Sequence, residues 1–243
     1  MKYETLEIET IEILLKHLKE HLNESKYPVW FRGQADSNWK LEPKLMRMDN
    51  RLPETHYYNR FKQSASFILP SQPKSEFEWL FLMQHYGVPT RLLDWSESPL
   101  VALYFALNSE FDKDGSLWVL LPTMLNLKSH YKPDYEFEIP SYEDELLKNY
   151  EPTIIARERK SSLLPMAAIA PRNSSRMQSQ QGVFTISHRE NIRIEEAGNE
   201  PFDHVWNYII PAKAKKGLQK DLRLLGFTKF QLFPELDSLS DNF

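Results

Sequence analysis

Apolar residues near the start of the chain recur with the period of an α-helix. They are separated by lysines and glutamates, and they comprise Ile8, Ile11, Leu14, Leu15, Leu18 and Leu22. This spacing predicts an amphipathic helix over about residues 5–24. Because the residue before a proline disfavours helical conformation, Tyr27 and Pro28 end it, and a strand is expected at 29–31. A second helix is predicted near 53–67.

The most hydrophobic part of the chain, residues 77–109, reads as a helix, a sharp turn and a second helix. The first helix, near 75–86, is apolar around most of its circumference, so we expect it to be buried. Gly87 and Pro89 form a strong stop signal after it. Ser96 or Ser98 can cap the second helix, whose first turn holds Pro99.

The remaining segments mix strands and helices without a regular alternation. After Gly115 the residues SLWVLLP predict a buried strand, and VWNYIIPA at 205–212 predicts another. A helix is expected near 213–225, with Gly226 just beyond its end. The polar, proline-broken segment 126–160 is interpreted as a peripheral excursion. The prediction is therefore a single α+β domain over 1–243, with a mixed, mainly antiparallel central sheet and buried helices packed against it.

Composition and charge indicate the class of protein and its location, but they do not indicate an activity. With 41% hydrophobic and 26% charged residues the chain has the composition of a soluble globular protein, and without cysteine it has no disulfide or thiolate site. The acid-containing start does not resemble a targeting segment, and no apolar run is long enough to span a bilayer. We therefore expect a cytoplasmic protein that does not associate with membranes. The net charge of -4 gives no overall attraction to nucleic acid.

The first candidate site residues follow the predicted strand at 29–31. Arg32 carries a side chain that is costly to bury without a partner. One interpretation is that it reaches solvent or a surface carboxylate at the strand end. The other is that it lines a cleft and offers its fork of donors to a phosphate or carboxylate, with Gly33 allowing close approach and Gln34 beside it.

A second group of polar residues joins the two buried helices at 85–95. Here His85 is a candidate acid, base or ligand donor, and Thr90 and Arg91 are candidates for holding an anion. The structural alternative is that Arg91 pairs with Asp94 while Thr90 or Asp94 caps the following turn. The spacing alone does not decide between them.

Three further features complete the chemical inventory. Planar hydrogen-bonding side chains precede the expected strand at 182–184, either as a solvated loop or as a site without a strong general base: Arg172, Arg176, Gln178, Gln180 and Gln181. The basic run at 212–220 is interpreted as a solvated helix face. No nucleotide-loop, serine-hydrolase or zinc-peptidase motif occurs, and no spacing indicates a metal site.

Several of these segments resemble the FRG domain, a family named for its Phe/Tyr-Arg-Gly motif. The resemblance is carried by FRGQ at 31–34, WKLEPKLMR at 39–47, QHYGVPTRLLDWSESPLVALYFA at 84–106, RMQSQQGVF at 176–184 and LGFTKFQLFPELD at 225–237. FRG domains are largely uncharacterised and occur mostly in bacteria and their viruses, so the resemblance implies a bacterial setting, such as phage defence or a toxin, without fixing an activity. It also implies that the candidate residues belong to one pattern and converge in space.

A weaker, fold-level analogy connects this pattern to ADP-ribosyltransferases. In those enzymes an arginine or histidine of the first strand holds NAD, and Arg32 would take that part here. A late glutamate usually activates the acceptor, whereas this chain has glutamines, which cannot serve as a general base. Either Asp94 substitutes for the glutamate, or the fold binds a nucleotide without transferring it. The analogy makes NAD a candidate substrate, and the sequence does not identify a cofactor.

Two functional hypotheses follow. In the first, the protein has a cleft for a nucleotide or another phosphate-bearing ligand and is ADP-ribosyltransferase-like; the candidate catalytic residues are His85, Asp94 and Gln181, and the candidate ligand-binding residues are Arg32, Gly33, Gln34, Thr90, Arg91, Arg176 and Gln178. In the second, it is a non-catalytic nucleic-acid-binding or protein-interaction module in which these residues are structural. The first predicts that Arg32, His85, Arg91 and Gln181 line one pocket, and it fails if they lie on separate surfaces.

Overall fold

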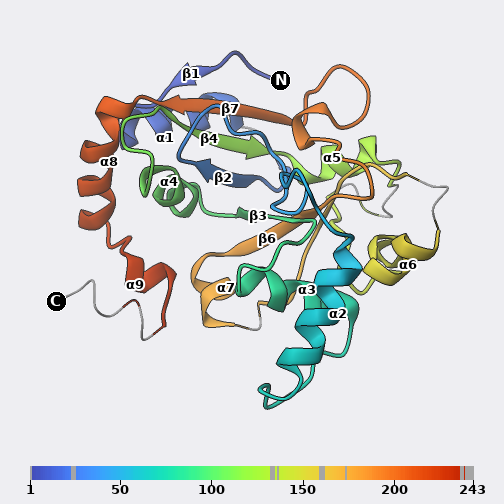
Figure 1. The fold of residues 1–243 in the computed structure, drawn as a ribbon. Helices are drawn as coiled ribbons and strands as arrows, with labels where there is room; N and C mark the ends of the chain where they lie inside the picture. The colour runs from blue at the N-terminus through green and yellow to red at the C-terminus, as the bar shows by residue number, and fades with distance from the viewer. Residues whose placement is uncertain are drawn as a thin grey trace.

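A seven-stranded mixed sheet organises the computed structural model, which describes residues 2–22, 26–131, 135, 137–158, 162–172, 174–235 and 238 (Figure 1). In spatial order the strands are β1 (Leu6–Glu7), β7 (Val205–Ile210), β4 (Gly115–Leu120), β2 (Trp30–Gln34), β3 (Leu92–Ser96), β6 (Gly182–Ile186) and β5 (Met166–Ala168). The β1–β7 pair is parallel and every other neighbouring pair is antiparallel. The predicted α+β class with a mainly antiparallel sheet is therefore confirmed.

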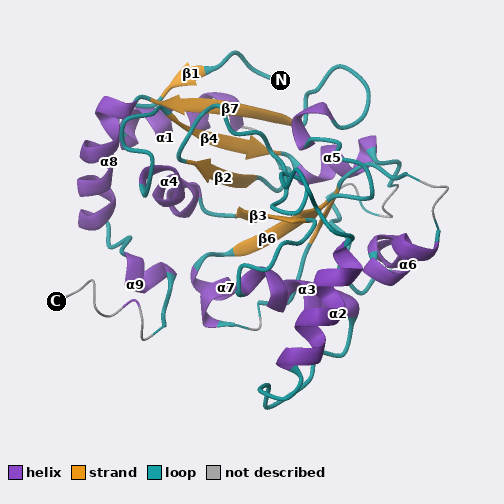
Figure 2. Cartoon of the chain, viewed as in Figure 1, coloured by secondary structure: helices purple, strands orange, loops and turns teal. Residues whose placement is uncertain are grey.

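Helices surround the sheet (Figure 2). In chain order they are α1 (Ile11–Leu22), α2 (Glu54–Ala65), α3 (Glu76–His85), α4 (Pro99–Leu107), α5 (Pro122–Lys128), the 3-10 helix η1 (Glu145–Tyr150), α6 (Pro152–Arg157), α7 (Ser175–Ser179), the 3-10 helix η2 (Ile194–Glu196), α8 (Ala212–Leu224) and α9 (Lys229–Leu232). None of the described helices is long and apolar enough to cross a membrane.

Alternation along the strands gives the sheet two buried faces. On one face, Phe31 of β2 joins α1, α4 and α8 in a core over the β7 side of the sheet. On the same face, Phe184 of β6 joins α2, α3 and η1 in a second core over the β5 side. The opposite face, which includes Trp30 and Trp95, is covered by α5, η2 and the loop at 35–53. Burial on both faces explains why these strands read as continuous apolar runs.

The two cores of the first face are separated where β2 meets β3. These strands share a single register pair, Phe31 with Ser96, whereas β2 pairs with β4 at five positions. Beyond that pair the guanidinium of Arg32 spans the opening, and its Nη1 donates a hydrogen bond of 2.5 Å to the backbone oxygen of Asp94. The sheet therefore opens at the residue that follows the apolar part of β2.

Helix α4 lies directly on β2 at this opening. A side chain at Gly33 would place its Cβ 1.8 Å from the oxygen of Ala102 and 2.7 Å from the nitrogen of Ala106. Only glycine allows this approach. The Gly33 backbone thus fixes the distance between the α4 helix and the edge of the opening.

Most predicted elements are found, with two corrections. The helices at 11–22, 54–65, 76–85 and 212–224 and the strands at 115–120 and 205–210 agree with expectation, but Leu6–Glu7, within the helix predicted over 5–24, form strand β1. Ser98 caps α4 with Pro99 in its first turn, and Gly87 and Gly226 have positive φ just after α3 and α8. The segment at 92–96, interpreted as part of a turn, is strand β3. Its alternation is hidden because four of its five residues are buried.

Two segments contribute more to the interior than the sequence indicated. In the segment 126–160, Tyr142, Leu147 and Tyr150 are buried in the core around α3. In the basic run at 212–220, Lys215 is fully buried and donates to three backbone oxygens. The interpretation of that run as a wholly solvated helix face was wrong at this position.

Candidate functional site

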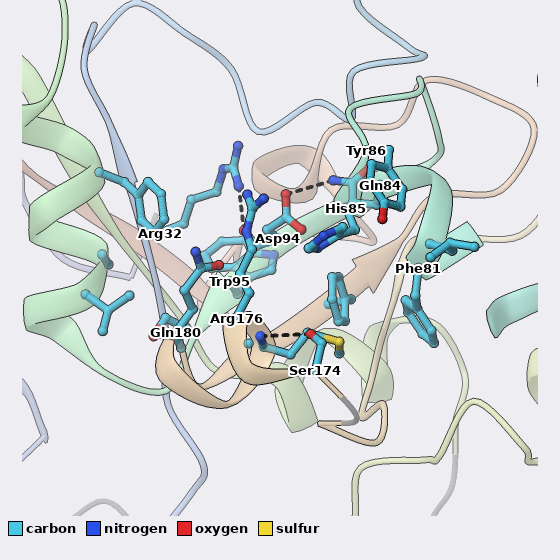
Figure 3. Close-up of a pocket in the computed structure, with 18 of the residues that line it drawn as sticks. Arg32, Phe81, Gln84, His85, Tyr86, Asp94, Trp95, Ser174, Arg176 and Gln180 are labelled. Atoms are coloured by element: carbon cyan, nitrogen blue, oxygen red, sulfur yellow. Dashed lines mark hydrogen bonds between the residues drawn. The ribbon is translucent and has the colours of Figure 1, made fainter. Parts of the chain in front are cut away.

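A cleft of about 740 Å³ lies on the sheet face between the two cores (Figure 3). Its floor comes from β2, β3 and β6, and its walls come from α3, α4 and α7. The volume lies within the range of about 300–1,000 Å³ that is typical of small-molecule sites. The opening between β2 and β3 therefore produces a concave site at the centre of the molecule.

Three arginines line the cleft: Arg32 from β2, Arg47 from the loop after it, and Arg176 from α7. None of them forms an ion pair with a carboxylate of the described residues. Arg47 makes no side-chain hydrogen bond there either, and Arg176 lies over the ring of Phe233 at 4.6 Å. Figure 3 shows Arg32 and Arg176 pointing toward the same space as Asp94.

Arg32 is the most constrained of these cations. Its Nε is buried and has no hydrogen-bond partner among the described residues. Burial lowers the pKa of Arg32 to about 10; the negative charge of Asp94 opposes this shift and the positive charge of Arg47 adds to it. Even so, the guanidinium is charged at neutral pH. The cleft therefore holds two neighbouring positive charges that lack full compensation, which favours binding of an anion.

Asp94 is held by a chain of hydrogen bonds from α3 and the start of β3. Gln84 donates from Nε2 to Oδ2 of Asp94 at 2.7 Å, and Thr90 donates from Oγ1 to Oε1 of Gln84 at 2.6 Å. Asp94 itself is solvent-exposed inside the cleft, whereas Thr90 is fully buried. A second carboxylate of the cleft, Glu78, accepts a hydrogen bond from the backbone of Lys74.

His85 occupies the α3 wall. Its Nε2 lies 3.6 Å from Oε1 of Glu235. Burial lowers the pKa of His85, the positive charge of Arg176 lowers it further, and Glu235 opposes both effects. His85 is therefore neutral at neutral pH, in the form that can accept a proton.

Aromatic side chains complete the walls. Phe81 of α3 and Phe105 of α4 line the cleft, and the side chains of Trp39 and Tyr86 are 39% and 65% exposed. Exposed aromatic faces in a cleft are suited to stacking on a flat ring. Among the described residues no cluster of three or more histidine, aspartate or glutamate side chains is placed to hold a metal ion.

The cleft brings together only some of the residues singled out from the sequence. Those that line it are Arg32, Gly33, Gln34, His85, Asp94 and Arg176; those that do not are Thr90, Arg91, Gln178 and Gln181. The amide of Gln34 is already engaged, since it accepts from Trp118 Nε1 and donates to the oxygen of Lys40. Of the four residues predicted to line one pocket, Arg32 and His85 line the cleft, and Arg91 and Gln181 do not.

The structure corrects the partner that the sequence interpretation gave to Arg91. Arg91 pairs with Glu54 of α2, with 2.7 Å between Nε and Oε2, and not with Asp94. Its other nitrogens donate to the backbone oxygens of Ser187 and Tyr150. Each guanidinium nitrogen of Arg91 therefore has a partner outside the cleft, and the buried side chain does not line it.

The glutamines are also placed differently. Arg176, Met177 and Gln180 line the cleft and Gln178 does not. Gln180 follows Arg176 by four residues and Met177 by three, spacings that place side chains on one side of a helical turn. Gln181 has a φ of 45° and uses its backbone oxygen to accept from Glu97. Of the three glutamines at 178–181, Gln180 lines the cleft, and its Nε2 donates to the oxygen of Leu232.

Arg47 and Gln84 are among the cleft residues that were not singled out as candidates. Arg47 stands at the end of the WKLEPKLMR stretch, and Gln84 precedes His85 in the central block. Neither has a motif of its own in one sequence, so only their position within these stretches gave a signal.

The comparison with protein families matches the part of the chain that supplies much of the cleft. The model of the FRG domain family matches residues 27–115, the stretch that contains Arg32, Arg47, Gln84, His85 and Asp94. No significant match was found among curated proteins or among solved structures.

Proposed function

We propose that this protein, whose residues 27–115 match the FRG domain family, binds a phosphate-bearing ligand, specifically a nucleotide, in the cleft between α3 and α4. The observation that carries the proposal is the pair of neighbouring guanidinium groups of Arg32 and Arg47. Neither has a carboxylate ion-pair partner among the described residues, and the positive charge of Arg47 lowers the pKa of Arg32. A phosphate between them supplies the missing negative charge and accepts hydrogen bonds from both forks.

A nucleotide fits the cleft better than inorganic phosphate does. The volume of about 740 Å³ far exceeds that of one phosphate group, and much of the lining is aromatic or aliphatic. A base would stack on an exposed ring such as Tyr86 or Trp39 while its phosphate contacts the arginines.

The proposed reaction is ADP-ribosyl transfer from NAD. In such a transfer the bond between ribose C1′ and the nicotinamide nitrogen breaks, nicotinamide leaves with the bonding electrons, and an acceptor nucleophile bonds to C1′. Arg32 and Arg47 would hold the diphosphate. Asp94 would stabilise the positive charge that develops on the sugar, and neutral His85 would take the acceptor proton. A setting in bacterial defence or toxicity rests on the FRG domain resemblance.

A second candidate function is a non-catalytic nucleic-acid-binding module. The observation that favours it is on α8, where Lys216, Lys220 and Arg223 are exposed and form no ion pair with a described residue. Spaced three or four residues apart, they occupy one side of the helix. Binding through phosphates would weaken steeply as salt is added.

Calorimetric titration tests the two functions together. NAD, ADP-ribose and short nucleic acids are titrated into the wild-type protein, Arg32→Ala, Arg47→Ala and Lys220→Ala, with exposed Arg60→Ala of α2 as a control. Nucleotide binding that both cleft variants weaken at least tenfold, and the control does not, supports the cleft. Absence of nucleotide binding at millimolar concentration contradicts it. Tight nucleic-acid binding that only Lys220→Ala weakens favours the second function.

A further inference from the structure

The hydrogen-bond chain at Asp94 has one possible direction of donation. The hydroxyl of Thr90 accepts a hydrogen bond from the backbone N–H of Leu92 at 3.2 Å, so its single proton is free to be donated to Oε1 of Gln84. With its oxygen engaged there, Gln84 directs its amide nitrogen at Oδ2 of Asp94. The buried end of the chain thus sets the orientation of the exposed carboxylate.

The second oxygen of the carboxylate is left without a partner. Oδ1 of Asp94 makes no hydrogen bond with a described residue, and Asp94 is an exposed residue that lines the cleft. The backbone oxygen of Asp94 accepts from Arg32, and the charge of the Asp94 carboxylate raises the pKa of Arg32, so the carboxylate lies near the guanidinium that we assign to the phosphate. An acceptor is therefore held beside the anion site at a fixed orientation.

The charge of Asp94 restricts what it can contact. A second phosphate would be repelled by the carboxylate, and a cationic ligand would be repelled by the three cleft arginines. A neutral hydrogen-bond donor attached close to a phosphate satisfies both conditions. The ribose of a nucleotide has this arrangement, since its hydroxyls are a few bonds from the 5′-phosphate, and carboxylates recognise ribose hydroxyls in other nucleotide sites.

We propose that Asp94, oriented by Gln84 and Thr90, accepts a hydrogen bond from a ribose hydroxyl, so that the cleft selects ribonucleotides over their deoxy counterparts. This inference rests on the proposed nucleotide function. Gln84 and Thr90 are positioning residues: they contact the carboxylate or each other, and not the ligand.

The test compares three probes by calorimetry: ADP, 2′,3′-dideoxy-ADP, and inorganic pyrophosphate, which reports on the arginines alone. For the wild-type protein we expect ADP to bind about 10- to 100-fold more tightly than dideoxy-ADP, the range for one hydrogen bond to a charged group. Asp94→Ala, an exposed position where folding is not at risk, should bring this ratio close to 1. Gln84→Leu should lower the ratio while leaving pyrophosphate affinity unchanged, and Gln63→Leu on the exposed side of α2 should change neither.

The outcomes separate this inference from the proposed function. If the wild-type protein binds ADP and dideoxy-ADP equally, ribose selection is overturned while the phosphate site stands. If Gln84→Leu lowers pyrophosphate affinity as much as ADP affinity, its role is structural and the positioning assignment is overturned. If neither ADP nor pyrophosphate binds, the proposed function itself fails.

Discussion

Glu54 and Arg91 form a buried ion pair that ties helix α2 to the start of strand β3. Their side chains are 6% and 4% exposed. Both oxygens of Glu54 accept from Arg91: Oε2 from the side-chain Nε and Oε1 from the backbone nitrogen. Two further donations from Arg91 reach the carbonyls of Ser187 and Tyr150. The arginine of the central block therefore connects four parts of the chain outside the cleft.

Removing one member of this pair should destabilise the fold without altering ligand contacts. We expect Arg91→Met to lower the free energy of unfolding by about 3–5 kcal/mol, because it leaves the Glu54 carboxylate buried and unpaired. Urea unfolding measures this loss. The double variant Arg91→Met with Glu54→Leu should recover part of it, and Arg60→Met on the exposed side of α2 should be nearly neutral. A loss below about 1 kcal/mol for Arg91→Met would contradict the structural role.

The contrast between Arg91 and Arg32 shows where sequence reasoning about the site succeeds and where it stops. Both were candidates because an arginine stands in an apolar setting. The partner of Arg91 is 37 residues away on another helix, so no local pattern reveals it. The cleft position of Arg32 depends on β2 and β3 separating after one register pair, which is a tertiary event. Similarly, Gln180 and not Gln181 lines the cleft. Gln180 directly follows helix α7, whereas Gln181 has a φ of 45°.

Gly33 should be intolerant of even a methyl group. In Gly33→Ala the new Cβ would overlap the oxygen of Ala102 on α4, so we expect a loss of more than about 3 kcal/mol of stability. The matched control is Gly217→Ala in α8, where a Cβ meets nothing within 4 Å. That variant should gain about 0.5–1 kcal/mol from helix propensity. Equal thermal stability of the two variants would contradict the close packing of α4 on β2.

Acidification should weaken the fold through His188. This buried side chain accepts from the N–H of Leu163 at Nδ1 and is 3.3 Å from the oxygen of Asn149 at Nε2, so its neutral form satisfies both. Burial and the positive charges of Arg91 and Arg189 lower the pKa of His188 to about 4. Its stabilising contribution is therefore complete above the unfolded pKa of about 6.5 and is lost as pH falls toward 4.

The expected size of this effect is about 2 kcal/mol between pH 7.5 and pH 5, from the difference between the two pKa values. Chemical unfolding at a series of pH values measures it. His188→Gln should show a shallower dependence over this range, and His56→Gln, at an exposed position on α2, should keep the wild-type dependence. Identical curves for His188→Gln and the wild type would refute the assignment.

Lys215 should be essential for stability although its neighbours are not. Its ammonium group donates to the backbone oxygen of Ala35, just after β2, at 2.7 Å and to that of Glu110, beyond the end of α4, at 2.8 Å. Burial lowers the pKa of Lys215. Lys215→Met leaves these carbonyls without a donor, which should cost about 3 kcal/mol or more. Lys216→Met, at the next and exposed position, should stay within about 0.5 kcal/mol of the wild type. Similar losses for both would contradict the role assigned to the buried ammonium.

The fold was more predictable than the site because its signals are local. Caps and stop signals at Ser98, Gly87 and Gly226 define helix ends within a few residues, and each is where the sequence indicated. Strand β3 was missed because burial of Leu92, Leu93 and Trp95 erases the alternation that identifies a half-buried strand. Lys215 was misread for a similar reason, since its acceptors come from segments more than 100 residues away.

A crystal structure of the protein with ADP-ribose tests the central claim most directly. We predict that the diphosphate lies between the guanidinium groups of Arg32 and Arg47, with a ribose hydroxyl within hydrogen-bond distance of Oδ1 of Asp94. A diphosphate bound outside the cleft, or an empty cleft in crystals grown at saturating ADP-ribose, would contradict the account.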